Sequence, residues 1–217
     1  MKNGITELVF ILDRSGSMAG LESDTIGGFN AMIERQKKQE GRCWLSTVLF
    51  DNDCTLLHDR LPLERVQPMT DADYRTGGCT ALLDAVGGAI RHIADIHRYA
   101  RPEDVPEHTL FVITTDGMEN ASRSYRADHV KQMIEHEKSK YGWEFIFLGA
   151  NIDAVQTAAH MGIGADRSAN YVNDGSGVEN NFDALSEVVC SVRACGCVPS
   201  AAMNKVRKDF ATRGKKR

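Results

Sequence analysis

The feature that most constrains this chain is an alternation between apolar runs of strand length and segments whose apolar residues recur at helical spacing. The predicted strands are residues 7–12, 44–50, 54–58, 108–117, 143–149 and 170–172. The first predicted helix starts near residue 25, and four more cover residues 83–97, 127–140, 153–161 and 178–194. Only Asp51-Asn52-Asp53 separates the second and third runs, which predicts a hairpin and therefore one antiparallel edge strand. We predict an α/β fold with a doubly wound, mostly parallel six-stranded sheet and helices on both faces, similar to a Rossmann fold.

Length and charge indicate one domain followed by a basic tail. The chain has 217 residues, of which 42% are hydrophobic, so it can bury a substantial core. Residues 205–217 contain seven basic residues and one acidic residue, a net charge of +6, which leaves −10 for the rest of the chain. An acidic body argues against general nucleic-acid binding. We therefore predict a domain over residues 1–197 and a solvated, frayed tail over residues 198–217, with contact between the tail and an acidic partner or nucleic acid as the alternative.

We expect a cytoplasmic protein. Its first residues lack the pattern of a signal peptide, and its apolar runs are too short to cross a membrane. We expect its six cysteines to be reduced and buried rather than paired in disulfides. Three of them, Cys190, Cys195 and Cys197, crowd together without the spacing of a zinc site, and we expect buried thiols at a helix end.

Polar clusters follow or precede three of these elements. Asp13, Ser15 and Ser17 follow the first strand, Thr80 precedes the central helix, and Asp116 ends the fourth strand. In a doubly wound sheet these loops meet at the carboxyl ends of the strands, where ligands bind. The cluster offers only oxygen donors, a set that suits hard cations rather than zinc. The sequence therefore predicts a site for Mg²⁺, with Mn²⁺ or Ca²⁺ as alternatives, held by two carboxylates and three hydroxyls.

The same three motifs resemble the metal-ion-dependent adhesion site of von Willebrand factor type A domains. Asp-x-Ser-x-Ser, Gly-Gly-x-Thr and Thr-Asp-Gly occur in the family's order, and the resemblance covers about residues 5–195. It implies metal ligation by Asp13, Ser15, Ser17, Thr80 and Asp116, some of it through water. In this family the metal usually does no chemistry and bridges to an acidic side chain of a partner protein. The resemblance is to stand-alone intracellular members, which implies a partner in an ATPase or multi-protein complex.

Other readings remain open at this stage. The metal could serve only the fold of a scaffold whose partners bind elsewhere. A metal-dependent hydrolase is less favoured, because an aspartyl phosphatase needs a second aspartate where this chain has Ser15. The spacing around Ser17 does not fit a serine hydrolase, and no dinucleotide-binding glycine motif follows the first strand. We thus assign no catalytic or cofactor-binding residues, expect Arg14 and Met18 to pack at the rim, and expect Asp84 to point outward without a special role.

Overall fold

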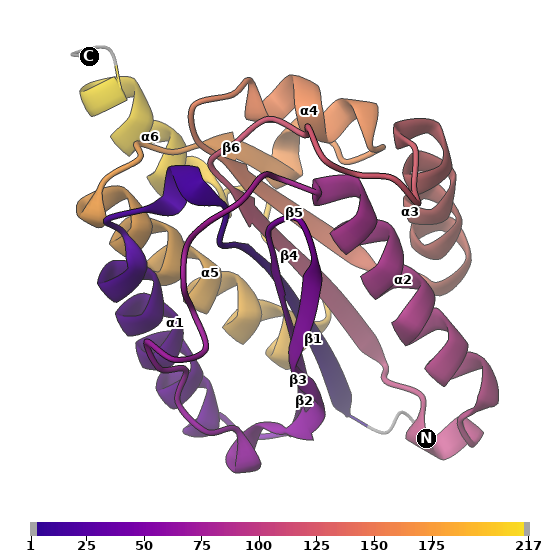
Figure 1. Ribbon diagram of the computed structural model, residues 1–217. Helices are drawn as coiled ribbons and strands as arrows, with labels where there is room; N and C mark the ends of the chain where they lie inside the picture. The colour runs from indigo at the N-terminus through magenta and orange to yellow at the C-terminus, as the bar shows by residue number, and fades with distance from the viewer. Residues whose placement is uncertain (1–3, 215–217) are drawn as a thin grey trace.

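The computed structural model describes residues 4–214 and has the predicted alternation of strands and helices (Figure 1). The strands are β1 (Ile5–Asp13), β2 (Arg42–Phe50), β3 (Cys54–Pro62), β4 (His108–Thr115), β5 (Glu144–Gly149) and β6 (Ser168–Asn170). The helices are α1 (Glu22–Lys37), α2 (Leu82–Tyr99), α3 (Ala127–Tyr141), α4 (Ala154–His160), α5 (Gly175–Cys195) and α6 (Asn204–Arg213). Four short 3-10 helices complete them: η1 (Gly16–Met18), η2 (Leu63–Arg65), η3 (Pro102–Asp104) and η4 (Ala165–Arg167).

The strands form one sheet in the order β3-β2-β1-β4-β5-β6. Every neighbouring pair is parallel except β2 and β3, which are antiparallel and place β3 at an edge. All nine residues of β1 are buried because β1 lies in the middle of the sheet with helices over both faces. The predicted fold class, including its antiparallel edge strand, is confirmed.

Two hydrophobic cores flank the sheet, and the alternation of side chains along each strand divides its residues between them. Figure 1 shows α1, α5 and α6 on one face and α2, α3 and α4 on the other. Phe10 of β1 belongs to the core under α1 and α5, whereas its neighbour Ile11 belongs to the core under α2 and α3. The loops that follow the strands therefore start from a sheet that is packed against helices on both faces.

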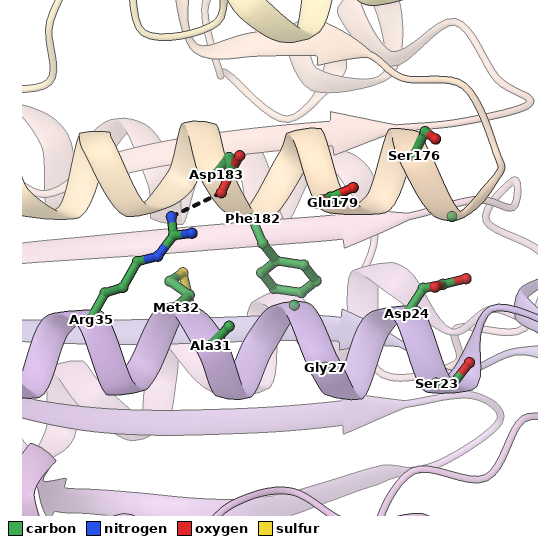
Figure 2. Close-up of a pocket in the computed structure, with 12 residues that line it drawn as sticks. Ser23, Asp24, Gly27, Ala31, Met32, Arg35, Ser176, Glu179, Phe182 and Asp183 are labelled. Carbon is green, nitrogen blue, oxygen red and sulfur yellow. Dashed lines mark hydrogen bonds and ion pairs between the residues drawn. The ribbon is translucent and has the colours of Figure 1, made fainter.

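The contact between α1 and α5 is close enough to require a glycine (Figure 2). A Cβ at Gly28 would lie 2.3 Å from the Phe182 ring, which points from α5 toward α1. Farther along the two helices, the Arg35 guanidinium forms an ion pair with Asp183 at 2.9 Å. A groove of about 530 Å³ lies between α1 and α5, and none of the five predicted metal-site residues lines it.

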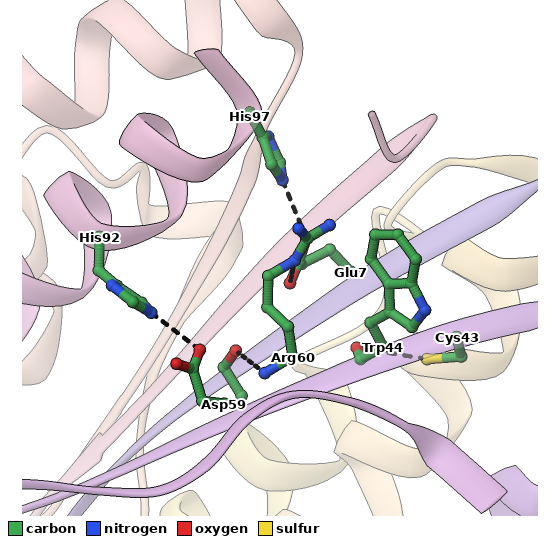
Figure 3. A network of polar contacts seen from close by, with 8 residues as sticks. Glu7, Cys43, Trp44, Asp59, Arg60, His92 and His97 are labelled. Atoms are coloured by element: carbon green, nitrogen blue, oxygen red, sulfur yellow. Dashed lines mark hydrogen bonds and ion pairs between the residues drawn. The ribbon is translucent and has the colours of Figure 1, made fainter. Parts of the chain in front are cut away.

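A buried polar network surrounds Glu7, near the N-terminal end of β1 (Figure 3). The Glu7 carboxylate is fully buried and accepts bonds from Arg60 Nε at 2.9 and 3.0 Å. His97 Nε2 lies 2.9 Å from the same carboxylate. The Arg60 guanidinium also stacks 4.0 Å from the centre of the Trp44 ring. This network joins the first strand to the edge strand and to α2.

The basic segment that ends the chain differs from the prediction of a frayed tail. Residues 204–213 form α6, which packs on α5 and β6, and Val206 is buried in the core beneath it. Arg207 donates to the Ser168 carbonyl oxygen at 2.9 Å, and Lys205 pairs with Asp183 at 3.0 Å. The prediction failed because the basic side chains bind carbonyl and carboxylate oxygens of the acidic body. Residues 215–217 lie outside the described part of the chain.

The cysteines are free, as predicted, but the expectation that they are buried is wrong for most of them. Only Cys43 is buried, and Cys54, Cys79, Cys195 and Cys197 are exposed. The buried face of α5 ends at Val192. Cys195 lies beyond that buried face, at the end of the helix, and Gly196, with a φ of +70°, then turns the chain so that Cys197 also stays outside the core.

Candidate metal centre

The site is built where β1 and β4 end side by side. Asp13 is the last residue of β1, and Asp116 directly follows β4, so the parallel pairing of these strands brings both carboxylates to one edge. The 3-10 helix η1 then turns Ser17 back toward Asp116, and its hydroxyl donates to Asp116 Oδ1 at 2.5 Å. Ser15 Oγ lies 3.1 Å from Ser17 Oγ. Residues 99 positions apart in the chain therefore share one polar cluster.

Thr80 reaches the cluster from the loop before α2. Its backbone is fixed by Asn120, whose side-chain oxygen accepts from the Thr80 N–H at 2.9 Å. A Cβ built on Gly117 would lie 2.8 Å from Thr80 Oγ1 and 3.4 Å from Ser17 Oγ. The Thr80 and Ser17 hydroxyls thus both lie close to the place where a side chain of residue 117 would project, which favours glycine at this position. The structure brings all five predicted residues together.

The two carboxylates are buried without a balancing cation. Asp13 and Asp116 are each 1% exposed. Burial raises the pKa of both, and the negative charge of Asp13 raises the pKa of Asp116 further. Within residues 4–214 neither forms an ion pair, and the neighbouring cation Arg14 is paired with Asp51 at 2.9 Å. A pair of buried carboxylates that lacks a protein cation is an environment in which a divalent cation is favoured.

Hydrogen bonds hold Asp13 in one orientation. Its Oδ1 accepts from the Ser15 N–H at 2.7 Å, and its Oδ2 accepts from the Thr115 hydroxyl at 2.6 Å. The Tyr74 hydroxyl donates to the Asp13 carbonyl oxygen. These contacts fix the end of β1 from three directions, which suits a residue that orients a metal site rather than one that moves.

Sequence reasoning missed Asn173, which completes the cluster from the loop before α5. Its Nδ2 donates to Asp116 Oδ2 at 3.1 Å. The composition of residues 173–177 indicated only a surface loop, and no signal in the sequence linked that loop to Asp116. The contact arises because β6 lies next to β5 at the end of the sheet, so the following loop crosses the site.

The expectation for Asp84 is also wrong. Its carboxylate accepts from the backbone N–H groups of Arg123, Ser124 and Tyr125 at 2.8, 2.9 and 2.8 Å. It thereby holds the segment that follows Asp116 against the start of α2. The sequence pattern predicts an outward-pointing side chain for Asp84, because no pattern of side chains reveals partners that are backbone groups.

The donor set determines what this site can hold. Among the described residues, no three His, Cys, Asp or Glu side chains are grouped to hold a metal, so hydroxyls must supply part of any coordination shell here. Two carboxylates and three hydroxyls fit a hard divalent cation and would leave positions for water or another ligand. The residues present therefore fit the predicted ion.

No helix among the described residues is long and apolar enough to cross a membrane.

Comparison with known proteins supports the fold and not a particular relative. No family model and no curated protein matches the chain. Among solved structures, a D319A mutant of the PilB minor pilin from Streptococcus sanguinis matches with a TM-score of 0.60 and 10% identity, over 88% of this chain and 63% of that one. Proximal thread matrix protein 1 from the mussel byssus, with a zinc-occupied MIDAS motif, matches with a TM-score of 0.58 and 14% identity, over 86% and 46%.

A third structure carries the name of the fold. A von Willebrand factor type A protein from Catenulispora acidiphila matches with a TM-score of 0.56 and 12% identity, over 86% of this chain and 42% of that one. This chain therefore spans between 42% and 63% of the lengths of these three proteins. The strand order, the helices on both faces and these similarities agree: the chain has the fold of a von Willebrand factor type A domain.

Proposed function

We propose that this protein is a divalent-metal-dependent protein-binding domain. A Mg²⁺ ion would be held by Asp13, Ser15, Ser17, Thr80 and Asp116 and would bridge to an acidic side chain of a partner protein. The observation that carries this proposal is the convergence of two uncompensated buried carboxylates with three hydroxyls at the ends of β1 and β4. The zinc-occupied motif of the mussel protein, which shares the fold, supports metal binding at such a site.

The charge of the site explains why an acidic partner would bind. Only two of the proposed ligands carry negative charge, so a bound divalent ion keeps an attraction for one more carboxylate. Asp13 is already engaged by Ser15 and Thr115, and its charge is shared with those donors. The ion would supply electrostatic attraction when bound, and a partner would approach it past Ser17, the exposed member of the five residues.

The rim of the site offers an apolar contact beside the proposed ion. Met118, two residues after Asp116, is 73% exposed. It lines a groove of about 540 Å³ together with Ile152 and Phe210, and the groove also includes Asn173, which binds Asp116. A partner segment with an acidic residue and a neighbouring apolar side chain would therefore fit this surface. We propose a partner of that kind, in an ATPase or multi-protein complex of the cytoplasm.

Two further candidates compete with this one. In a scaffold the same ion would serve only the fold, and partners would bind elsewhere. In a metal-dependent hydrolase the ion would activate water. The binding role is favoured because an exposed apolar rim adjoins the site, a feature that neither alternative requires. We accordingly propose that the protein is not an enzyme.

Affinity capture from native cell extract tests the proposal. The unchanged protein and Ser17→Ala would each be used in Mg²⁺ and in chelator, and bound proteins identified by mass spectrometry. Ser124→Ala is a matched control, because Ser124 lies in the loop after Asp116 but contributes only its backbone N–H to Asp84. A partner retained only by the unchanged protein and the control in Mg²⁺ supports metal bridging. The same partners under every condition would contradict metal bridging, and any bound metal would then serve the fold alone.

A further inference from the structure

Two exposed thiols lie in contact at the end of α5. Cys195 is the last residue of the helix, Cys197 follows one residue later, and their Sγ atoms are 3.0 Å apart. Both side chains are exposed, so small reagents can reach them. We propose that Cys195 and Cys197 form a redox-reactive dithiol that low-molecular-weight disulfides, such as oxidised glutathione, convert to a disulfide. This inference does not depend on the proposed metal site.

The turn between the two cysteines is fixed by Gly196. This residue has a φ of +70°, and its N–H donates to the Val192 carbonyl oxygen at 2.8 Å, which ends the helix. A Cβ at this position would lie 2.1 Å from the His108 ring. On the far side of the turn, the Ser191 hydroxyl donates to the Cys197 carbonyl oxygen at 3.0 Å. The two thiols therefore face each other because the backbone between them has little freedom.

The surroundings give the two sulfurs different roles. The hydrogen bond between the two sulfurs lowers the pKa of the Cys195 thiol and raises the pKa of the Cys197 thiol. Cys195 is thus the attacking thiol and Cys197 the one that closes the ring. Elsewhere in the chain, burial raises the pKa of Cys43 to about 12. The Cys54 side chain is exposed, but partial desolvation of its thiol and the nearby charges of Asp84, Asp51 and Asp53 raise its pKa to about 11, so both thiols are poorly reactive.

The reaction balances with glutathione disulfide as the oxidant. The Cys195 thiolate attacks one sulfur of the disulfide, so a mixed disulfide forms and one glutathione thiolate leaves. The Cys197 thiolate then attacks Cys195 Sγ, which forms the Cys195–Cys197 bond and releases the second glutathione. The two protons of the protein thiols end on the two glutathione molecules. The protein loses two electrons, and the glutathione disulfide gains them.

The sequence supplies a peptide that reports this reaction alone. Trypsin cleavage after Arg193 and Lys205 gives residues 194–205, which contain Cys195 and Cys197 and exclude Cys190. The folded protein would be incubated with oxidised glutathione, trapped with iodoacetamide in denaturant, digested and examined by mass spectrometry. We expect this peptide to lose two hydrogens and carry no label, whereas the untreated peptide carries two labels.

Three variants make the test sharp. In Cys197→Ser the mixed disulfide on Cys195 has no resolving thiol, so we expect at least about tenfold more glutathione adduct at Cys195 than in the unchanged protein. Cys195→Ser should abolish closure, and Cys190→Ser, at a partly buried thiol bonded to Gln36, should leave closure unchanged. The proposal is overturned if the peptide keeps both labels while the exposed Cys79 becomes modified. It is also overturned if the unchanged protein accumulates as much Cys195 adduct as Cys197→Ser.

Discussion

Replacing Asp13 by asparagine should separate the stability of the metal-free protein from its response to metal. An asparagine keeps the bond from the Ser15 N–H, and its amide can donate to Thr115 once that hydroxyl turns to the Gly117 carbonyl oxygen at 3.2 Å. Burial raises the pKa of Asp13, so its charged form destabilises the folded state at neutral pH, and its charge also acts on Asp116. We therefore expect metal-free Asp13→Asn to be at least as stable as the unchanged protein near pH 7.

The stabilisation by Mg²⁺, in contrast, should be smaller in Asp13→Asn than in the unchanged protein. At a free Mg²⁺ concentration of about 100 times Kd, binding stabilises a folded protein by about 2.7 kcal/mol. For a domain of this size that raises Tm by roughly 5–10 °C. If loss of the Asp13 charge weakens binding about 100-fold, the gain at the same concentration falls to about 0.4 kcal/mol, or roughly 1–2 °C.

Thermal unfolding followed by circular dichroism, with and without Mg²⁺ in chelator-treated buffer, measures both effects. Asp53→Asn is the matched control, because it makes the same chemical change at an exposed position in the hairpin between β2 and β3. It should keep the full rise in Tm. The reasoning fails if Asp13→Asn also keeps the full rise, or if the metal-free variant melts several degrees below the unchanged protein.

Three further predictions concern other parts of the molecule. Glu7→Gln should lower the free energy of unfolding in urea by about 3–5 kcal/mol, because the half-buried Arg60 guanidinium loses the counter-charge of the fully buried Glu7 carboxylate; a loss under about 1 kcal/mol would contradict this. Burial lowers the pKa of His58, so the unfolded state binds its proton more tightly, and urea unfolding should show stability falling as pH drops below about 6.5. His58→Gln should reduce that slope, and an unchanged slope would exclude His58 as its source. Gly117→Ala should weaken Mg²⁺ binding by at least about tenfold in calorimetry, because its Cβ would lie 2.8 Å from Thr80 Oγ1; unchanged affinity would remove Thr80 from the site.

The sequence predicted those features that local patterns encode. Buried parallel strands are apolar over their whole length, so β1 and β4 and the polar residues at their ends could be recognised directly. The sequence alone therefore predicts that Asp13 and Asp116 lie at one edge of the sheet. The alternation of strands and helices likewise predicts that the loop with Thr80 meets these two residues at the carboxyl ends of the strands.

The remaining features depend on contacts between distant segments, which no local pattern reports. Asn173 reaches Asp116 only because β6 ends the sheet next to β5. Asp84 binds backbone groups of another loop, and backbone donors are the same in every sequence. The docking of α6 depends on how the basic side chains meet oxygens of the acidic body. Tertiary contacts of this kind explain why the sequence predictions for Asp84, Asn173 and the basic segment were wrong or incomplete.

The most direct test of the central claim is the position of a bound metal. Crystals of the full chain would be grown with Mn²⁺, and the ion located by its anomalous scattering. We predict a peak among the hydroxyls of Ser15, Ser17 and Thr80 and the carboxylates of Asp13 and Asp116, and its loss when Mg²⁺ is added in excess. A fully formed site with no peak at saturating Mn²⁺, or a peak only at other residues, would contradict the account.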